Sequence, residues 1–247
     1  MRRLVKRVGI ICVSLVMMAG AGFDSYAIAE PQMPALYQLV LNRYRVAVED
    51  MWSGQRLFNN DMSILTMYPY VYYITEEPEK RLDKIGFCLL DIDGDGSEEL
   101  LIGNISDDYP EKCIYDVYSI VDGEVKRVLS SIERERFFIN ADGMILDDGS
   151  SGASNSSMLW GELDTKSGQL TECYGIRSDG VDDNGELICY LESIGENERA
   201  EQVRISSEEY GKIREKYLDE TAQLSMTPFR KVKLRRVREG YYRRVER

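Results

Sequence analysis

Five oxygen-bearing residues stand at alternate positions from Asp91 to Glu99, a spacing that suits a hard metal ion. They are Asp91, Asp93, Asp95, Ser97 and Glu99. Ca²⁺ takes six to eight oxygen ligands in a flexible geometry, and alternate aspartates on a tight turn direct their carboxylates to one interior point. Without a cation, carboxylates this close repel one another. The spacing therefore predicts a Ca²⁺ site with these ligands, Ser97 contributing its carbonyl. The alternative is a plain turn whose aspartates only cap and solvate the backbone.

The residues around this loop argue against an EF-hand. An EF-hand needs a bidentate glutamate at position twelve, which here is Ile102, and helices on both sides. Short apolar runs, 87–90 and 100–102, flank the loop instead. Gly96 permits a backbone conformation that a side chain would block. We therefore expect a strand–loop–strand site that is closed by Glu99.

The run from Asp91 to Glu99 resembles the Asp-x-Asp-Gly-Asp-Gly-x-x-Asp/Glu loops of FG-GAP and VCBS repeats and, more distantly, dockerin loops. Glu99 replaces the more usual aspartate, and the chain carries one such loop where propellers carry many. More broadly, the layout resembles uncharacterised exported Gram-positive proteins, on residues 1–29, 35–55, 86–103 and 114–118. The resemblance implies an exported protein with one calcium loop and implies no particular activity.

Other acidic residues are weaker candidates for chemistry. Asp147 and Asp148 form a candidate acid/base pair for glycoside cleavage. Residues 179–186 fit an acidic turn better than a second calcium loop, because Gly180 occupies the first ligand position. The sequence contains no histidine, which excludes Ser-His-Asp catalysis, Cys-His catalysis and histidine metal sites. An enzyme built from this chain would depend on carboxylates, lysine, tyrosine or a metal held by oxygen.

Aromatic and basic residues supply two candidate binding surfaces. The densest group of tyrosines comprises Tyr68, Tyr70, Tyr72 and Tyr73. These side chains form either a carbohydrate-stacking strip or half-buried packing residues. Residues 227–247 form a basic C-terminal segment with a net charge of +7. The segment docks on the acidic domain, binds an anionic wall polymer or membrane surface, or is a solvated tail.

The N-terminal residues 1–29 predict a signal peptide. Four basic residues precede the apolar run 8–21, and residues 27–29 form a small-x-small cleavage site. A retained anchor is the weaker alternative, because the apolar run is shorter than a membrane-spanning helix. Cleavage would change the formal net charge from −12 to −15, which disfavours nucleic-acid binding. We expect a secreted, extracellular or cell-surface protein with no integral membrane span in the mature chain.

Four cysteines remain after cleavage, and the predicted compartment is oxidising. They are Cys88, Cys113, Cys173 and Cys189. Under one interpretation they form one or two disulfides, and the sequence leaves open which of the three possible pairings of the four cysteines occurs. Free buried cysteines are the other interpretation.

Hydrophobic periodicity predicts which elements hold the loop. Apolar residues at helical spacing predict a helix over 34–55, and a second short helical piece is expected over 57–67. After residue 84 the pattern changes to alternating β-formers, with Asp122-Gly123 as a hairpin turn and 149–157 as an exposed loop. Ser206 is expected to start a last helix.

These elements predict a single α+β domain over residues 30–226, an antiparallel β meander with helices at its N- and C-terminal ends. The leading functional hypothesis is a secreted calcium-binding protein, a non-catalytic binding or interaction module in which Ca²⁺ is structural. Its expected partners are Ca²⁺ and a cell-wall polymer, a glycan or another protein. The alternative is a carboxylate-based, histidine-free hydrolase that acts on glycan or cell-wall polymer.

Overall fold

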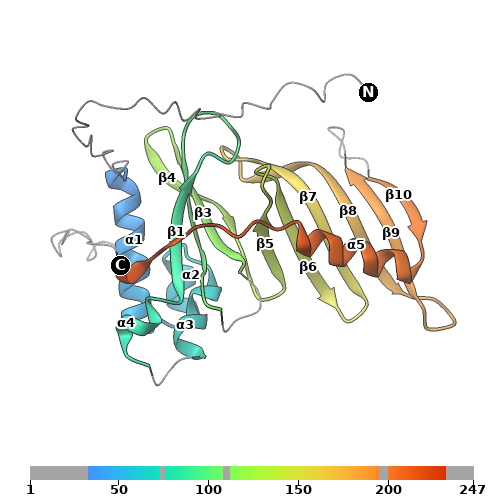
Figure 1. Ribbon diagram of the computed structural model, residues 1–247, viewed down its shortest axis with the longest axis horizontal. Helices are drawn as coiled ribbons and strands as arrows, with labels where there is room; N and C mark the ends of the chain where they lie inside the picture. Colours follow the sequence, from blue (N-terminus) through green and yellow to red (C-terminus); the bar gives the residue numbers. More distant parts are fainter. Residues whose placement is uncertain (1–32, 73–75, 108–111, 195–199, 232–247) are drawn as a thin grey trace, which may run out of the picture. The chain divides into compact units, whose positions relative to one another are not determined.

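A computed structural model describes residues 33–72, 76–107, 112–194 and 200–231 (Figure 1). The predicted signal peptide, Tyr73 and residues 232–247 of the basic segment lie outside the described residues. All described residues belong to one compact unit that begins at Met33. In the part of the chain that the structure describes, no helix is long and apolar enough to cross a bilayer.

Helices come first in the described chain. Helix α1 spans Ala35–Glu49 and buries the face that carries Val40, Tyr44 and Val48. The helix predicted over 34–55 therefore exists but ends earlier, because Ser53 caps a new helix by accepting a hydrogen bond from the Arg56 N–H. The short helical segments that follow are α2 (Gly54–Asn59), η1 (Ile64–Met67), α3 (Tyr68–Val71) and α4 (Pro78–Arg81).

Eleven strands in the described residues form one antiparallel sheet, which confirms the predicted combination of an antiparallel sheet with helices. They are β1 (Ile85–Leu90), β2 (Glu99–Asn104), β3 (Ile114–Val121), β4 (Glu124–Ser130), β5 (Glu135–Ile139), β6 (Ile145–Gly152), β7 (Asn155–Asp164), β8 (Gln169–Val181), β9 (Leu187–Ile194), β10 (Ala200–Ile205) and β11 (Thr227–Pro228). The strand order is β10-β9-β8-β7-β6-β5-β3-β2-β1-β11, and β4 pairs with β3. Most neighbours in the sheet are therefore neighbours in sequence, as in a meander.

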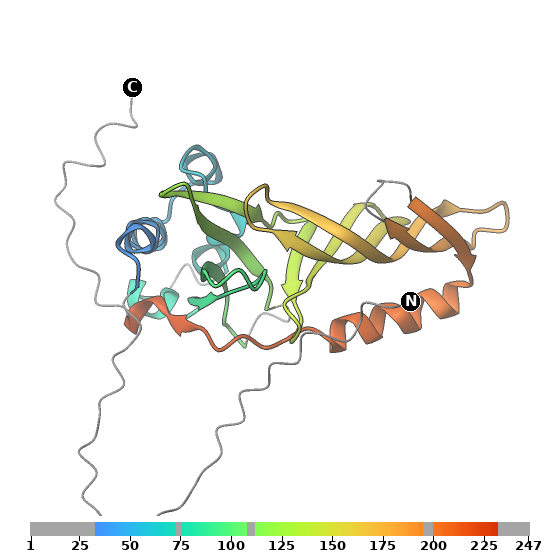
Figure 2. The same ribbon diagram turned by 90° about the horizontal axis from the view of Figure 1, so that it is seen from above.

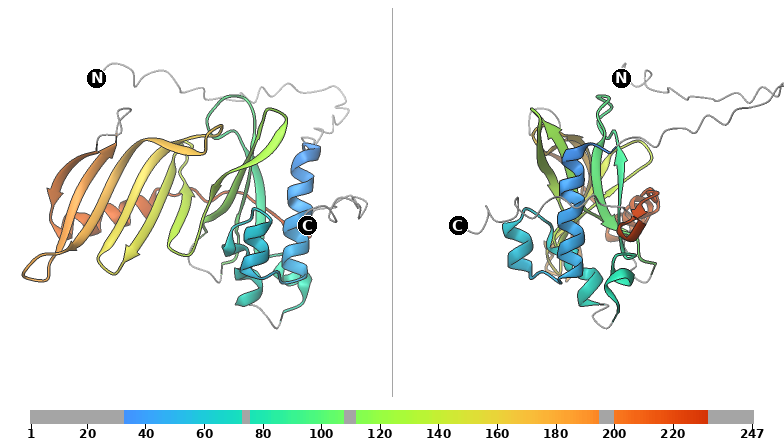
Figure 3. Two further views of the ribbon diagram at one scale, coloured as in Figure 1. Left: turned by 180° about the vertical axis from the view of Figure 1, so that it is seen from behind. Right: turned by 90° about the vertical axis from the view of Figure 1, so that its left-hand side faces the viewer.

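Helix α5 (Ser207–Asp219) lies against one face of β7 to β9 (Figures 1 and 2). It begins at Ser206 with the reciprocal capping-box hydrogen bonds between Ser206 and Glu209, as predicted. The Tyr217 ring meets the buried Trp160 ring edge-on at 6.0 Å. Helix α1 covers the other end of the sheet, near β1, β3 and β4 (Figure 3).

Two turns show where local sequence signals succeed and fail. Asp122 and Gly123 both have positive φ, 56° and 78°, and join β3 to β4 as the hairpin signal predicted. The prediction of an exposed loop over 149–157 is wrong. Strands β6 and β7 pair through this segment, with Gly149 opposite Ser157 and Ser150 opposite Ser156. Backbone hydrogen bonding across a hairpin needs no apolar side chain, so a Gly/Ser-rich segment can still form strands.

A buried carboxylate lies between α1 and β3. Asp116 is 0% exposed, and its Oδ2 accepts hydrogen bonds from the Tyr44 hydroxyl and from the Ser63 N–H at 2.7 Å. The Arg127 guanidinium is 3.6 Å from Asp116 Oδ1 and also pairs with Asp61 at 2.9 Å. Burial raises the pKa of Asp116 to about 7, and the hydrogen bonds and Arg127 oppose this shift.

The first residues of the basic segment belong to the fold. Strand β11 pairs with β1, with Pro228 opposite Gly86. The short helix η2 (Phe229–Lys231) follows, and the Phe229 side chain is fully buried. Arg230 Nε donates a hydrogen bond of 2.8 Å to Asp83. This part of the segment is therefore docked on the domain.

The four cysteines that follow the predicted signal peptide are free in the structure, as in the free-cysteine interpretation. Cys113, Cys173 and Cys189 are buried, and Cys88 is partly buried. Burial raises the pKa of the Cys88 thiol to about 11 and that of Cys113 to about 12. These thiols are therefore protonated and packed as small apolar side chains at neutral pH.

Candidate metal centre

The loop from 91 to 98 joins two paired strands. Strands β1 and β2 form an antiparallel pair whose last register partners are Leu90 and Glu99. Inside the loop, Gly94 and Gly96 have φ values of 71° and 92°. Both angles lie in the left-handed region, where glycine carries no steric penalty, so the two glycines let the chain fold back tightly between the strands. The result is the strand–loop–strand arrangement that the sequence predicts.

Three of the five predicted ligands come together in space. One carboxylate oxygen each from Asp91, Asp93 and Glu99 lies within 4.8 Å of the other two. With Ca²⁺–oxygen distances of 2.3–2.6 Å, two oxygens on opposite sides of one ion are at most about 5 Å apart. The three oxygens therefore fit around a single Ca²⁺ ion. Further ligands would have to come from backbone carbonyls or water.

Backbone N–H groups of the loop orient two of these carboxylates. The Gly96 N–H donates a hydrogen bond of 3.1 Å to Asp91 Oδ2, and the Asp95 N–H donates one of 3.1 Å to Asp93 Oδ1. Each of these carboxylates keeps an oxygen lone pair for another partner. The turn therefore fixes the directions of the carboxylates and leaves them able to bind an ion.

Glu99 closes the loop from the first position of β2 and is only 1% exposed. Its Oε2 accepts a hydrogen bond from the Ile92 N–H at 3.1 Å, and its Oε1 accepts one from the Ser119 hydroxyl at 3.2 Å. Burial is the main cause that raises the pKa of Glu99 to about 6, and the negative charges of Asp93 and Asp95 contribute to this shift. A nearby cation would stabilise the ionised form, so this carboxylate is well placed to gain from a bound ion.

The other two predicted ligands lie at the surface of the loop. Asp95 and Ser97 are exposed, and the Ser97 N–H donates a hydrogen bond of 2.8 Å to Asp95 Oδ1. Asp95 is not a member of the group of three clustered carboxylates. Asp95 instead accepts the Ser97 N–H and closes a local turn beside the three clustered carboxylates.

Two hydroxyl groups that contact the clustered carboxylates could not be identified from the sequence. Ser119 reaches Glu99 from β3, and the Thr165 hydroxyl donates a hydrogen bond of 2.6 Å to Asp93 Oδ2 from the turn between β7 and β8. These residues are 20 and 72 positions away from their partners. Only the sheet topology brings them to the loop, so no local spacing could have identified them.

No family model, no curated protein and no solved structure matches the chain. The resemblance to FG-GAP, VCBS and dockerin loops therefore stays a prediction based on the residues of the loop.

The structure separates the predicted acid/base pair. Asp147 and Asp148 are consecutive residues of β6, and consecutive strand residues point to opposite faces of a sheet. Asp147 stands opposite Leu159, whereas Asp148 stands opposite Met158. Burial, together with smaller contributions from the charges of Glu135 and Asp148, raises the pKa of Asp147 to about 7. Since the two carboxyl groups face opposite sides, they cannot act together on one glycosidic bond.

The tyrosine cluster does not form an alternating strip in the described residues. Tyr68 and Tyr70 lie in helix α3, and Tyr72 is the residue that caps its end. Tyr70 is buried and its hydroxyl donates to the Trp52 carbonyl, whereas Tyr72 is exposed and packs edge-on against Tyr68 at 5.4 Å. Helical geometry therefore places Tyr70 away from the contacting Tyr68 and Tyr72 rings, which favours the packing interpretation.

The acidic segment 179–186 comprises the last residues of β8 and an ordinary turn, 182–186, that leads into β9. Asp182 Oδ1 accepts hydrogen bonds from the N–H groups of Asn184 at 2.9 Å and Glu186 at 3.1 Å. Gly185 has a φ of 81° and completes the turn. The arrangement agrees with the acidic-turn interpretation.

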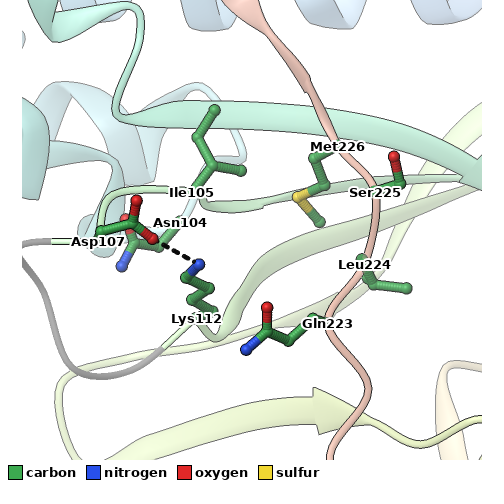
Figure 4. Close-up of a pocket in the computed structure, with 8 residues that line it drawn as sticks. All are labelled: Asn104, Ile105, Asp107, Lys112, Gln223, Leu224, Ser225 and Met226. Carbon is green, nitrogen blue, oxygen red and sulfur yellow. Dashed lines mark hydrogen bonds and ion pairs between the residues drawn. The ribbon is translucent and has the colours of Figure 1, made fainter.

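A cavity of about 300 Å³ lies beside the end of β2 (Figure 4). The residues that line it are Asn104, Ile105, Asp107, Lys112, Gln223, Leu224, Ser225 and Met226. Its one carboxylate, on Asp107, is paired with Lys112 Nζ at 2.8 Å, as the dashed line in Figure 4 marks. Among these described residues, the cavity lacks the second acid that a two-carboxylate glycoside hydrolase requires.

Proposed function

We propose that the Asp91–Glu99 loop binds one Ca²⁺ ion and that the ion has a structural role. The observation that carries the proposal is the convergence of the Asp91, Asp93 and Glu99 oxygens within 4.8 Å. In the absence of a cation, these three charges oppose the folding of the loop. A bound divalent cation reverses this effect, and the oxygen ligands and flexible geometry favour Ca²⁺ over softer metals.

The burial of Glu99 supports a structural role. Asp91 is exposed, whereas Glu99 is buried and hydrogen-bonded to Ser119 on β3. An ion held between them would connect the exposed loop to the interior of the sheet. Sites of this kind in extracellular modules bind Ca²⁺ with dissociation constants of about 10⁻⁴–10⁻³ M. Such an affinity suits a permanent stabilising ion in an exported protein better than a signal-responsive switch.

Calcium is expected to raise the melting temperature of the protein. At 10 mM CaCl₂ the ion would exceed its dissociation constant by about 10–100-fold and stabilise the fold by about 1.4–2.7 kcal/mol. For a chain of this size that corresponds to about 5 °C. Differential scanning fluorimetry with and without CaCl₂ measures the shift. Asp93→Ala should abolish the response, because it removes one of the three clustered carboxylates.

Asp183→Ala is the matched control, since it removes an exposed acid of the same charge from the β8–β9 turn. This variant should keep the full calcium response. An unchanged melting temperature of the wild-type protein in 10 mM CaCl₂ would contradict the proposal.

We further propose that the protein is exported and acts as a non-catalytic binding or interaction module, with helices at both ends of its domain. The four basic residues and the apolar run at the N-terminus support export. The alternative glycan hydrolase gains no support from Asp147 and Asp148, which face opposite sides of the sheet, or from the cavity, whose single acid is paired with Lys112. A glycan, cell-wall polymer or protein partner remains part of this proposal.

A further inference from the structure

Thr165 reaches the candidate metal centre from a hairpin that is distant in the sequence. It is the first residue after β7, it is 1% exposed, and its hydroxyl donates a hydrogen bond of 2.6 Å to Asp93 Oδ2. A buried threonine hydroxyl has one proton to donate, and here that proton goes to the carboxylate. The β7–β8 turn therefore contacts one of the three clustered carboxylates directly.

The β7–β8 turn holds Thr165 in place through contacts of its own. Asp164 Oδ1 accepts a hydrogen bond of 2.9 Å from the Lys166 N–H. Gly168 has a φ of 75° and lies so close to β4 that an added Cβ would be 2.4 Å from the Val128 carbonyl oxygen. Because these contacts do not involve the loop, the turn presents the threonine hydroxyl to Asp93 from a fixed position.

The β5–β6 turn also packs against the 91–98 loop and restricts its position. Ile92 is 8% exposed and belongs to the buried cluster that includes Ile145 and Leu163. Gly143 has a φ of 85°, and an added Cβ would lie 2.9 Å from the Ile92 carbonyl oxygen. Asp93 therefore follows a residue that is anchored in the core, so both ends of the Thr165–Asp93 contact have little freedom to move.

We infer that Thr165 positions Asp93 for the cation and that the bound cation links the β7–β8 hairpin to the β1–β2 hairpin. This inference rests on the proposed Ca²⁺ site. A hydrogen-bond partner behind a metal ligand fixes the orientation of that ligand, and losing the partner typically weakens metal binding about 10–100-fold. Conversely, an ion that immobilises Asp93 also immobilises the acceptor of the Thr165 hydroxyl. Calcium binding in one hairpin should therefore slow local opening of the other.

Calorimetric titration of the purified protein with CaCl₂ tests the positioning role. Thr165→Val keeps nearly the same shape but lacks the hydroxyl, so the dissociation constant is expected to rise about tenfold. Thr165→Ser keeps the hydroxyl and should restore most of the lost affinity. Thermal melting without calcium shows whether each variant folds. Asp93 is partly exposed, so water can replace the lost donor, and the melting temperatures without calcium should be similar.

Hydrogen exchange with and without CaCl₂ tests the link between the hairpins. In the wild-type protein, calcium should slow exchange in 91–97 and also in 165–168; in Thr165→Val the slowing should be confined to 91–97. Equal calcium affinity and equal protection in wild type and Thr165→Val would overturn the role of Thr165 and leave the Ca²⁺ site standing. A wild-type protein that binds no calcium would overturn the site and this inference together.

Discussion

Replacing Asp116 with alanine is expected to lower the free energy of unfolding by about 3–5 kcal/mol. The carboxylate is fully buried and accepts hydrogen bonds from the Tyr44 hydroxyl and the Ser63 N–H. Alanine would leave the Ser63 N–H buried without its acceptor, would leave the Tyr44 hydroxyl with Tyr118 as its one remaining hydroxyl partner at 3.1 Å, and would remove one of the two carboxylates near Arg127. Urea denaturation followed by tryptophan fluorescence measures the loss.

The same carboxyl group should make stability depend on pH. Burial raises its pKa from 3.8 to about 7, so the folded protein holds this proton more tightly than the unfolded chain does. The stabilising contribution of this group is therefore fully present below the unfolded pKa of 3.8 and is lost as the pH rises through about 7. Within that window the group contributes a slope of up to about 1.4 kcal/mol per pH unit.

Asp116→Asn separates the pH effect from the packing effect. Its amide oxygen can still accept from Tyr44 and Ser63, but the side chain does not titrate between pH 4 and 7. Its stability profile should be shallower than that of the wild type, though not flat, because the pKa of Asp147 is also raised to about 7. Superimposable profiles for wild type and Asp116→Asn would contradict the burial of this carboxyl in the folded protein.

The elements predicted best from the sequence were those whose signals are local. The loop from Asp91 to Glu99 carries its own turn glycines, and the apolar runs on both sides pair as β1 and β2. The Asp122-Gly123 turn and the Ser206 cap are likewise set by a few adjacent residues. In each case the backbone conformation depends on side chains within a few positions, so a short stretch of sequence contains the relevant physics.

The features that the sequence could not predict depend on pairings between distant residues. Thr165 meets Asp93 only because the β7–β8 turn packs beside the β1–β2 loop. Tyr44 meets Asp116 across 72 positions because α1 covers β3. Asp147 and Asp148 face opposite sides because β6 continues as a regular strand through both residues. Register and topology, rather than residue type, decide such contacts.

Replacing Phe229 with alanine is expected to lower the free energy of unfolding by about 3–5 kcal/mol. The side chain is fully buried, and its ring centroid lies 5.6 Å from that of Phe87 and 6.1 Å from that of Tyr44. Alanine would leave a cavity between β1 and α1 and would remove both aromatic contacts. Urea denaturation at neutral pH measures the change.

Arg230→Ala is the matched control at the next position. Arg230 forms an ion pair with Asp83 at 2.8 Å, but its side chain is 56% exposed. Exposed ion pairs contribute at most about 1 kcal/mol, so this variant should stay close to the wild type. A loss in Arg230→Ala as large as that in Phe229→Ala would mean that the ion pair with Asp83 holds the start of the basic segment as strongly as the burial of Phe229 does. A large loss in Phe229→Ala alone would show that the apolar side chain anchors the start of the segment and that the Arg230–Asp83 ion pair contributes little to this docking.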